Sequence, residues 1–213
     1  MSRTAPGVIV LGMHRSGTSM LGGLLSNVFS WNVPGMQVTA TKRSQNSKGF
    51  YENVDVARQN DEWMGLQDMS WNKVNLFTQS VEGRQVVVGE FVKSMATKVG
   101  SNGEKAMEVY NNAVNTPWAM KDPRLCLTLD AWTPLLHSDL KKPAILFTYR
   151  NPLEVAMSLL ARKVSSVPLL EGLRLWIWYN REAIILSSGM CRVITRLVKF
   201  TFIQFYSCSP TSR

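Results

Sequence analysis

The sequence of 213 residues has few of the features that mark specialised protein classes. Its three cysteines, Cys126, Cys191 and Cys208, form no CxxC pair, which predicts neither a disulfide framework nor a zinc site. The two histidines, His14 and His137, have no acidic cluster beside them, so we expect no metal. No stretch approaches the roughly 18 apolar residues of a membrane span, and the N-terminal apolar run is too short for a secretory signal. We therefore expect a cytoplasmic protein without a membrane span.

Positive charge is abundant but scattered. Lys and Arg number 24 against 15 Asp and Glu, a net charge of +9, without a run of five basic residues. This distribution favours a pocket for a polyanionic small molecule, and we expect no nucleic-acid partner. A nucleic-acid face and a membrane-surface face are the alternatives. The length suits a single domain, and the oligomeric state is left open.

Short apolar strands alternate with helices along the chain. This alternation predicts an α/β fold in which a parallel sheet is flanked by helices in three layers. The predicted strands cover residues 8–11, 117–121, 143–149 and 192–198. The predicted helices cover 18–27, 53–66, 124–136, 151–162 and 169–188, with a loop over 29–48 and one or two helices within 67–103.

The turn after the first strand, "GMHRSGTS" at Gly12–Ser19, matches the spacing of a phosphate-binding loop, with Thr18 at the usual lysine position. Backbone N–H groups at the start of the following helix would converge on an anion. A nucleoside triphosphatase would also need that lysine and a strand-ending aspartate for magnesium, and neither is evident. Arg15 supplies positive charge instead. The alternative is a plain strand–helix turn with an exposed arginine.

The stretch "FTYRNPLEVAMSLL" contains a second candidate for anion binding. Arg150 ends a predicted strand, where open α/β sheets bind ligands. Ser158 follows eight residues later, about two turns into a helix that Asn151 would cap. Arginine and hydroxyl together suit a phosphate. The alternative pairs Arg150 with a surface carboxylate and leaves Ser158 facing solvent.

Together these two segments resemble the sulfotransferase superfamily, and most closely its tyrosylprotein, glycosaminoglycan and bacterial-type branches. Members carry a (Lys/Arg)-Ser-Gly-Thr-(Thr/Ser) loop and, much later, Arg-(Asn/Asp)-Pro with a serine eight residues after the arginine. The resemblance implies a P-loop NTPase-like sulfotransferase fold and 3′-phosphoadenosine 5′-phosphosulfate (PAPS) as co-substrate. It assigns the 5′-phosphosulfate to Arg15, Ser16, Gly17, Thr18 and Ser19, and the 3′-phosphate to Arg150 and Ser158.

The resemblance also implies a catalytic set of Arg15, Lys121 and Glu52. Lys121 ends a predicted strand in "WAMKDPRL" and would stabilise the transferring sulfuryl group; the alternative is a surface Lys–Asp pair. Glu52, in "KGFYENVD", would be the general base. The alternative is an exposed glutamate in the first turn of a helix. Arg124 would contact an acidic substrate or cap the following helix.

The acceptor would be a hydroxyl or amine on a carbohydrate, a peptide tyrosine or a small molecule. Phe50, Tyr51, Trp63 and Trp71 are candidates for its pocket, with the hydrophobic core as the alternative place for the tryptophans. His14 adjoins the loop and would either contact substrate or serve a structural role.

The C-terminal segment departs from the family pattern. We predict a sulfotransferase domain over residues 1–195 and an atypical basic tail over 196–213, because no acidic residue follows Glu182. Cytosolic sulfotransferases close an Arg-Lys-Gly segment over the nucleotide, and nothing comparable follows Thr195. The resemblance therefore implies a truncated or altered C-terminus and impaired transfer. Two other classes stay open, a P-loop kinase or nucleoside triphosphatase and an inactive nucleotide-binding fragment.

Overall fold

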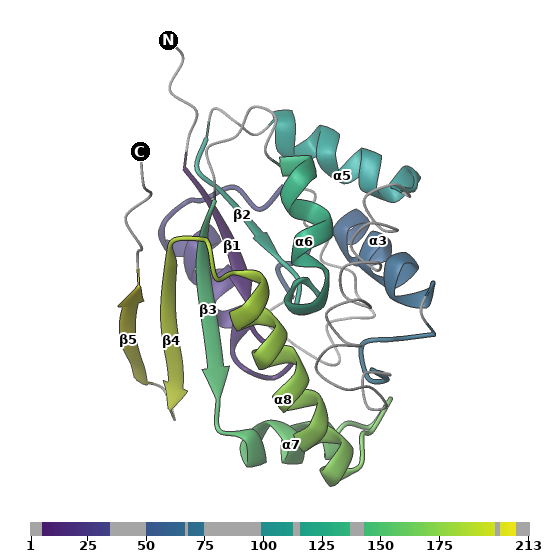
Figure 1. The fold of residues 1–213 in the computed structure, drawn as a ribbon. Helices are drawn as coiled ribbons and strands as arrows, with labels where there is room; N and C mark the ends of the chain where they lie inside the picture. The colour runs from purple at the N-terminus through teal and green to yellow at the C-terminus, as the bar shows by residue number, and fades with distance from the viewer. Residues whose placement is uncertain are drawn as a thin grey trace.

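The computed structural model describes residues 6–34, 50–66, 68–74, 99–112, 116–136, 143–198 and 201–207. Within these ranges five strands form one sheet in the order β2-β1-β3-β4-β5. The strands are β1 (Gly7–Leu11), β2 (Trp118–Lys121), β3 (Ala144–Arg150), β4 (Arg192–Val198) and β5 (Thr201–Ser207). The first four are parallel and β5 runs antiparallel to β4 (Figure 1).

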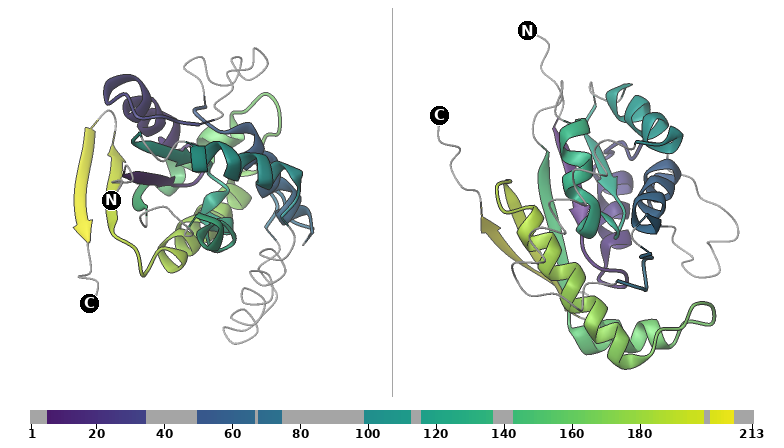
Figure 2. Two further views of the ribbon diagram at one scale, coloured as in Figure 1. Left: turned by 90° about the horizontal axis from the view of Figure 1, so that it is seen from above. Right: turned by 45° about the vertical axis from the view of Figure 1, so that its right-hand side comes forward.

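Helices cover both faces of the sheet. α1 (Thr18–Gly23) and the π-helical η1 (Leu24–Val28) lie behind the strands in Figure 1, whereas α6 (Leu125–Leu136) and α8 (Leu169–Leu186) lie in front. The view from above in Figure 2 shows the same three layers. α3 (Val54–Gly65) and α5 (Ser101–Asn112) pack beside α6, and α7 (Pro152–Leu160) lies near the end of β3. The predicted α/β fold, a parallel sheet flanked by helices, is confirmed.

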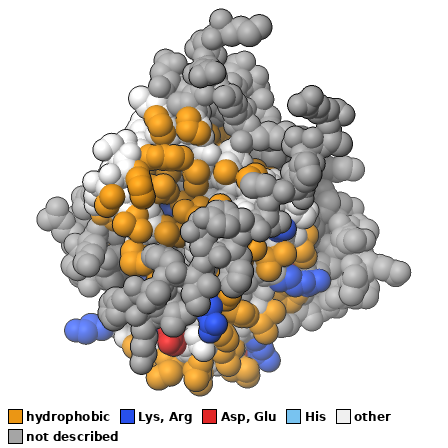
Figure 3. Space-filling model, turned by 90° about the vertical axis from the view of Figure 1, so that its left-hand side faces the viewer, with side chains coloured by type: hydrophobic (Ala, Val, Ile, Leu, Met, Phe, Trp, Pro, Cys, Tyr) orange, Lys and Arg blue, Asp and Glu red, His pale blue; other side chains and the backbone are white. Residues whose placement is uncertain are grey.

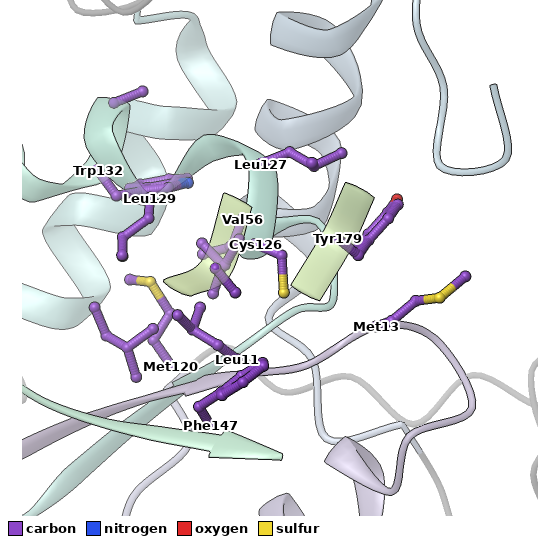
Figure 4. Packing of buried hydrophobic residues seen from close by; sticks show 14 of the residues in the cluster. Leu11, Met13, Val56, Met120, Cys126, Leu127, Leu129, Trp132, Phe147 and Tyr179 are labelled. Atoms are coloured by element: carbon purple, nitrogen blue, oxygen red, sulfur yellow. The ribbon is translucent and has the colours of Figure 1, made fainter. Parts of the chain in front are cut away.

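The central strands are apolar because helices cover them on both sides. Ile9, Val10 and Leu11 of β1 are fully buried. Figure 4 shows Leu11 close to Met120 of β2 and Phe147 of β3, with the side chains of α6 packed over them. Burial of this apolar area, at about 25 cal/mol per Å², stabilises the packing of the helices on the sheet. It holds the ends of β1, β2 and β3 in fixed positions.

The start of α7 follows the predicted capping. The Asn151 side chain accepts a hydrogen bond from the backbone N–H of Leu153 at 2.9 Å, and Pro152 occupies the first helical position. Proline is suited to that position because its missing N–H would have no helical partner there. This cap fixes where the helix leaves the end of β3.

The C-terminal segment differs from the sequence prediction. Residues 201–207 form β5, which pairs with β4 along its whole length. The sequence segment "TFIQFYS" has no regular alternation of apolar and polar residues. Strand pairing adds backbone hydrogen bonds independently of side-chain periodicity, so this segment can still form an edge strand. β4 also runs across residue 195, so the division into a domain and a basic tail remains a prediction.

Some of the sequence predictions fall on residues outside the described ranges, and one prediction differs from the structure. Four of the positions named above lie outside the described residues: His137, Cys208, residues 35–49 of the predicted loop and residues 75–98. Cys191 is disulfide-bonded, although the spacing of the cysteines predicted no disulfide framework. None of the helices in the described ranges combines the length and the hydrophobicity that a bilayer crossing requires. The face in Figure 3 shows many hydrophobic side chains, with Lys and Arg mainly toward its lower end.

Candidate active site

The carboxyl ends of three parallel strands bring the predicted site residues to one edge of the sheet. In the strand register Val10 lies beside Lys121 of β2, and Leu11 lies beside Phe147 of β3. The loop that follows β1 is therefore flanked by the ends of both neighbouring strands. Open α/β sheets bind ligands at such an edge.

The Gly12–Ser19 loop turns sharply into α1. Arg15 and Gly17 have left-handed backbone, with φ of 72° and 91°. The Thr148 hydroxyl of β3 donates to the Ser16 carbonyl at 3.1 Å and ties the loop to the sheet. No side chain from the described residues caps the helix at Gly17. Successive amides in such a turn form an anion-binding concavity.

Gly12 anchors the loop to its surroundings. Its N–H donates to the Cys126 sulfur of α6 at 3.1 Å. Its φ is +149°, and a Cβ there would lie 2.5 Å from the Thr148 carbonyl oxygen. A larger residue would therefore meet backbone that cannot move aside. A Cβ at Gly17 would likewise lie 2.7 Å from Leu197 of β4.

The two predicted anion-binding segments meet in space. Arg15 Nε donates to Ser158 Oγ at 2.7 Å, and Arg150 Nη1 donates to the Arg15 carbonyl at 3.4 Å. Arg150 also forms an ion pair with Glu154 at 2.7 Å, as the alternative interpretation expected. The Trp176 indole donates to the Arg150 carbonyl at 2.9 Å and fixes the end of β3. Arg15, Arg150 and Ser158 thus belong to one constellation.

Lys121 and Glu52 form a buried pair. Lys121 Nζ lies 2.7 Å from Glu52 Oε1, and the two side chains are 1% and 10% exposed. The same ammonium donates to the Phe50 carbonyl at 2.9 Å and to Ser19 Oγ at 3.2 Å. Lys121 is therefore not a surface partner of Asp122. The contact with Ser19 joins this pair to the loop.

Arg124 lies beside the same strand end and is held by two carboxylates. It forms ion pairs with Asp122 at 2.7 Å and with Asp61 at 2.8 Å. Burial alone would lower the pKa of Arg124, but these two carboxylates raise it above its ordinary value. Burial raises the pKa of Asp122, whose side chain is completely enclosed. Arg124 is thus a rigid, permanently charged group.

A pocket of about 480 Å³ opens at this edge. Its lining residues are His14, Arg15, Gly17, Thr18, Ser19, Phe50, Glu52, Trp71, Lys121, Pro123, Arg124, Arg150, Arg162 and Leu197. Five of these residues are basic, and one is acidic. Ser16 and Ser158 are not among the lining residues. Ser16 is fully buried within the loop, and Ser158 contacts the lining residue Arg15.

Two aromatic candidates for the acceptor pocket were wrong. Trp63 is 1% exposed and packs edge-on against Trp132, with ring centroids 5.1 Å apart, so it belongs to the core. The Tyr51 hydroxyl accepts from Asn27 at 2.9 Å, away from the pocket lining. Phe50 and Trp71 do line the pocket. Sequence patterns cannot separate these cases because aromatic residues suit both environments.

His14 lies among the basic residues of the pocket. The pKa of His14 lies well below its ordinary value. Burial is the largest cause, and the positive charge of four basic neighbours adds to it. Those neighbours are Arg124, Lys121, Arg162 and Arg15. The imidazole is therefore neutral at neutral pH.

Arg162 is a pocket residue that sequence reasoning missed. It follows α7 in a short loop, and its guanidinium lies 4.6 Å from the centre of the Trp71 ring. No motif marks it, because a basic residue at a helix end usually serves only the helix dipole. Leu197 was also missed, since its place beside Gly17 depends on how β4 pairs with β3.

The fold and this pocket define an α/β protein with a polycationic site at the carboxyl edge of a parallel sheet. In the described ranges, no group of three or more His, Cys, Asp or Glu side chains is arranged to hold a metal ion.

No protein-family model matches the chain, and no curated protein matches it. Among solved structures, the chain is similar to a sulfotransferase domain from the curacin biosynthetic pathway. The two chains are 14% identical in sequence, and their structures superpose with a TM-score of 0.48. The similarity covers 92% of this chain and 68% of the chain of the curacin-pathway domain.

Proposed function

We propose that this protein is a sulfotransferase that uses PAPS to modify a hydroxyl or amine of an acceptor. One observation carries the proposal: the Arg15 loop and the Arg150–Ser158 segment meet in one constellation, with Arg15 bonded to Ser158 at 2.7 Å. A nucleotide with phosphates at both its 5′ and 3′ positions needs two anion sites at a fixed spacing. The two segments would supply such a pair of sites, and their contact supports the proposal.

The residues present fit the donor. Gly17, Thr18 and Ser19 line the pocket at the start of α1, where backbone N–H groups suit a phosphosulfate. Arg15 adds positive charge on the same turn. Arg150 and Ser158 would hold the 3′-phosphate, with the planar guanidinium donating to two of its oxygens. Ser16 is buried within the loop, and its carbonyl accepts a hydrogen bond from Thr148, which would hold the loop against the sheet.

The contact between Lys121 and Glu52 supports the proposed catalytic roles. Bound PAPS would supply a sulfuryl group that leaves its phosphate and joins the acceptor oxygen or nitrogen. Glu52 would take the acceptor proton, an effect worth about 10²–10⁴ in rate. Lys121 and Arg15 would meet the developing negative charge, and loss of one such donor costs about 10²–10³ in rate. Lys121 also keeps the Glu52 carboxylate oriented through their 2.7 Å contact.

A ligand-dependent unfolding experiment tests the donor assignment. Adenosine 3′,5′-bisphosphate at 100 times its dissociation constant should raise the free energy of unfolding by about 2.7 kcal/mol. ATP with magnesium should stabilise the protein less at equal concentration. Stronger stabilisation by ATP with magnesium would instead identify a P-loop kinase or nucleoside triphosphatase. No response to the bisphosphate would overturn the proposal.

A transfer assay then separates an active enzyme from an inactive nucleotide-binding fragment. We expect radiolabelled sulfate to pass from PAPS to at least one member of a panel of carbohydrates, tyrosine peptides and small phenols. Binding of the bisphosphate without transfer to any acceptor would identify the inactive form. The acceptor that reacts then becomes the substrate for the variants described below.

A further inference from the structure

A carboxylate lies within the segment that we propose binds the 3′-phosphate. Arg150 ends β3, Glu154 lies in the first turn of α7, and Ser158 follows one turn later on the same helix. Residues four apart on a helix share a face, so Glu154 and Ser158 project from the same side of α7. The proposed transfer gives this acid no role, although it lies between the two residues that would hold the phosphate.

Glu154 binds the guanidinium that the phosphate would need. Arg150 Nε donates to Glu154 Oε2 at 2.7 Å. Arginine binds a phosphate most strongly through two parallel N–H groups on one edge of the guanidinium. Because Glu154 occupies the edge that carries Nε, a phosphate can use that edge only by displacing Glu154.

The ion pair between Arg150 and Glu154 can open at little cost. The two side chains are 31% and 38% exposed. Ion pairs in such contact with water are weak, because water screens both charges and the side chains lose freedom in forming them. A phosphate monoester carries nearly two negative charges at neutral pH, so it should displace a single carboxylate. The released carboxylate would then turn into solvent.

Arg150 has other contacts that hold it in place. Its Nη1 donates to the Arg15 carbonyl at 3.4 Å, and the Trp176 indole donates to the Arg150 carbonyl at 2.9 Å. Neither contact involves Glu154, so the carboxylate is not needed to direct the guanidinium. Its effect on the site is therefore mainly electrostatic, because it offsets one of the two positive charges that Arg15 and Arg150 bring together.

We propose that Glu154 competes with the 3′-phosphate for Arg150 and thereby weakens the binding of the nucleotide. The inference rests on the proposed function and extends it to the departure of the spent donor. After each transfer, adenosine 3′,5′-bisphosphate must dissociate before another PAPS molecule can bind. As its 3′-phosphate moves away, Glu154 pairs again with Arg150, which shortens the lifetime of the complex.

Two substitutions separate competition from orientation. Glu154→Gln keeps the shape of the side chain and removes its charge, whereas Glu154→Ala also removes the hydrogen-bond acceptor. Both variants should bind adenosine 3′,5′-bisphosphate about three- to tenfold more tightly than wild type, as measured by isothermal calorimetry. The proposal is overturned if either folded variant fails to bind more tightly. Weaker binding by Glu154→Ala would show instead that Glu154 orients Arg150.

Adenosine 5′-monophosphate locates the effect at the 3′-phosphate. This nucleotide lacks that group, so its affinity should change by less than about twofold in both variants. An equal gain for the two nucleotides would place the effect elsewhere and overturn the proposal.

The matched control is Glu171→Gln. Glu171 is likewise an acid in the first turn of a helix, α8, and its carboxylate pairs with Arg174 at 2.5 Å. Its side chain is 48% exposed, close to the exposure of Glu154. The control should leave the affinity for the bisphosphate unchanged. A gain as large as that of Glu154→Gln would show a general effect of net charge and would overturn the proposal.

The rate of nucleotide release tests the second half of the proposal. Stopped-flow displacement should show slower dissociation of the bisphosphate from Glu154→Gln than from wild type, since changes in affinity at one site mostly alter the dissociation rate. A rate equal to that of wild type would contradict the role of Glu154 in release.

Failure of this proposal is distinguishable from failure of the proposed function. If neither the wild type nor the two Glu154 variants bind the bisphosphate, the proposed function itself is contradicted. If the wild type binds the bisphosphate and the variants bind it no more tightly, the competition by Glu154 alone is contradicted.

Discussion

Arg15 donates its Nε hydrogen to the Ser158 hydroxyl at 2.7 Å, although 143 residues separate them in the sequence. The contact exists because β1 and β3 are parallel neighbours, so the loop after one and the helix after the other begin at the same edge. α7 then carries Ser158 toward the loop. An anion at this position would be met from both segments at once.

Replacing Arg15 by alanine should abolish transfer. The variant loses the charge that we propose acts on the sulfuryl group and also the link to Ser158. We expect kcat/KM to fall by at least about 10²–10³. Steady-state kinetics with PAPS and the reactive acceptor measure it. Arg58→Ala serves as the control, since Arg58 lies on the exposed side of α3. Turnover close to wild type in Arg15→Ala would contradict the assignment.

Lys121 and Glu52 should be strongly coupled in a double-mutant cycle. Lys121→Met or Glu52→Gln alone leaves a buried charge without its partner, which costs about 3–5 kcal/mol in comparable pairs. Because the side chains are 2.7 Å apart, the double variant should be less destabilised than the sum of the two, by about 0.5–3 kcal/mol. Urea unfolding of all four proteins gives the coupling. Additive losses would show that the pair does not interact in solution.

Gly12→Ala should destabilise the fold. The strained backbone alone costs about 1–3 kcal/mol, and the new Cβ would lie 2.5 Å from the Thr148 carbonyl. Gly65→Ala is the matched control, because a Cβ at the end of α3 would meet nothing within 4 Å. That control should be neutral or stabilising by up to about 1 kcal/mol. Chemical denaturation measures both, and equal stability of the two variants would rule out the close approach at Gly12.

The free energy of unfolding should fall as the pH drops below the ordinary His14 pKa of 6.5. Burial and the surrounding positive charge keep the folded imidazole neutral, whereas the unfolded one binds a proton there. Below this pH the unfolded state binds a proton that the folded state does not. The free energy of unfolding should therefore fall by up to about 1.4 kcal/mol for each unit of decrease in pH. His14→Gln should remove this contribution. Denaturation between about pH 5.3 and 7.5 tests it, and identical slopes for both proteins would contradict the burial of His14.

Much of the fold was predictable because it depends on local chemistry. The β-branched run of β1, the glycines at the turn and the Asn151-Pro152 cap each specify a conformation within a few residues. The parallel sheet follows from the alternation of strands with helices. β5 was not predictable, because an edge strand forms through backbone pairing with β4 and leaves no clear period in its own side chains.

The sequence by itself determined which residues are suited to bind anions: Arg15 and Gly17 in a tight turn, and Arg150 at the end of a strand. The tertiary structure alone decided their partners. Arg162 reaches the pocket through its contact with Trp71, Trp63 is withdrawn into the core, and Lys121 lies against Glu52. The physical reason is that residue type and spacing act over a few residues, whereas these contacts depend on strand order and on the packing of helices from distant parts of the chain.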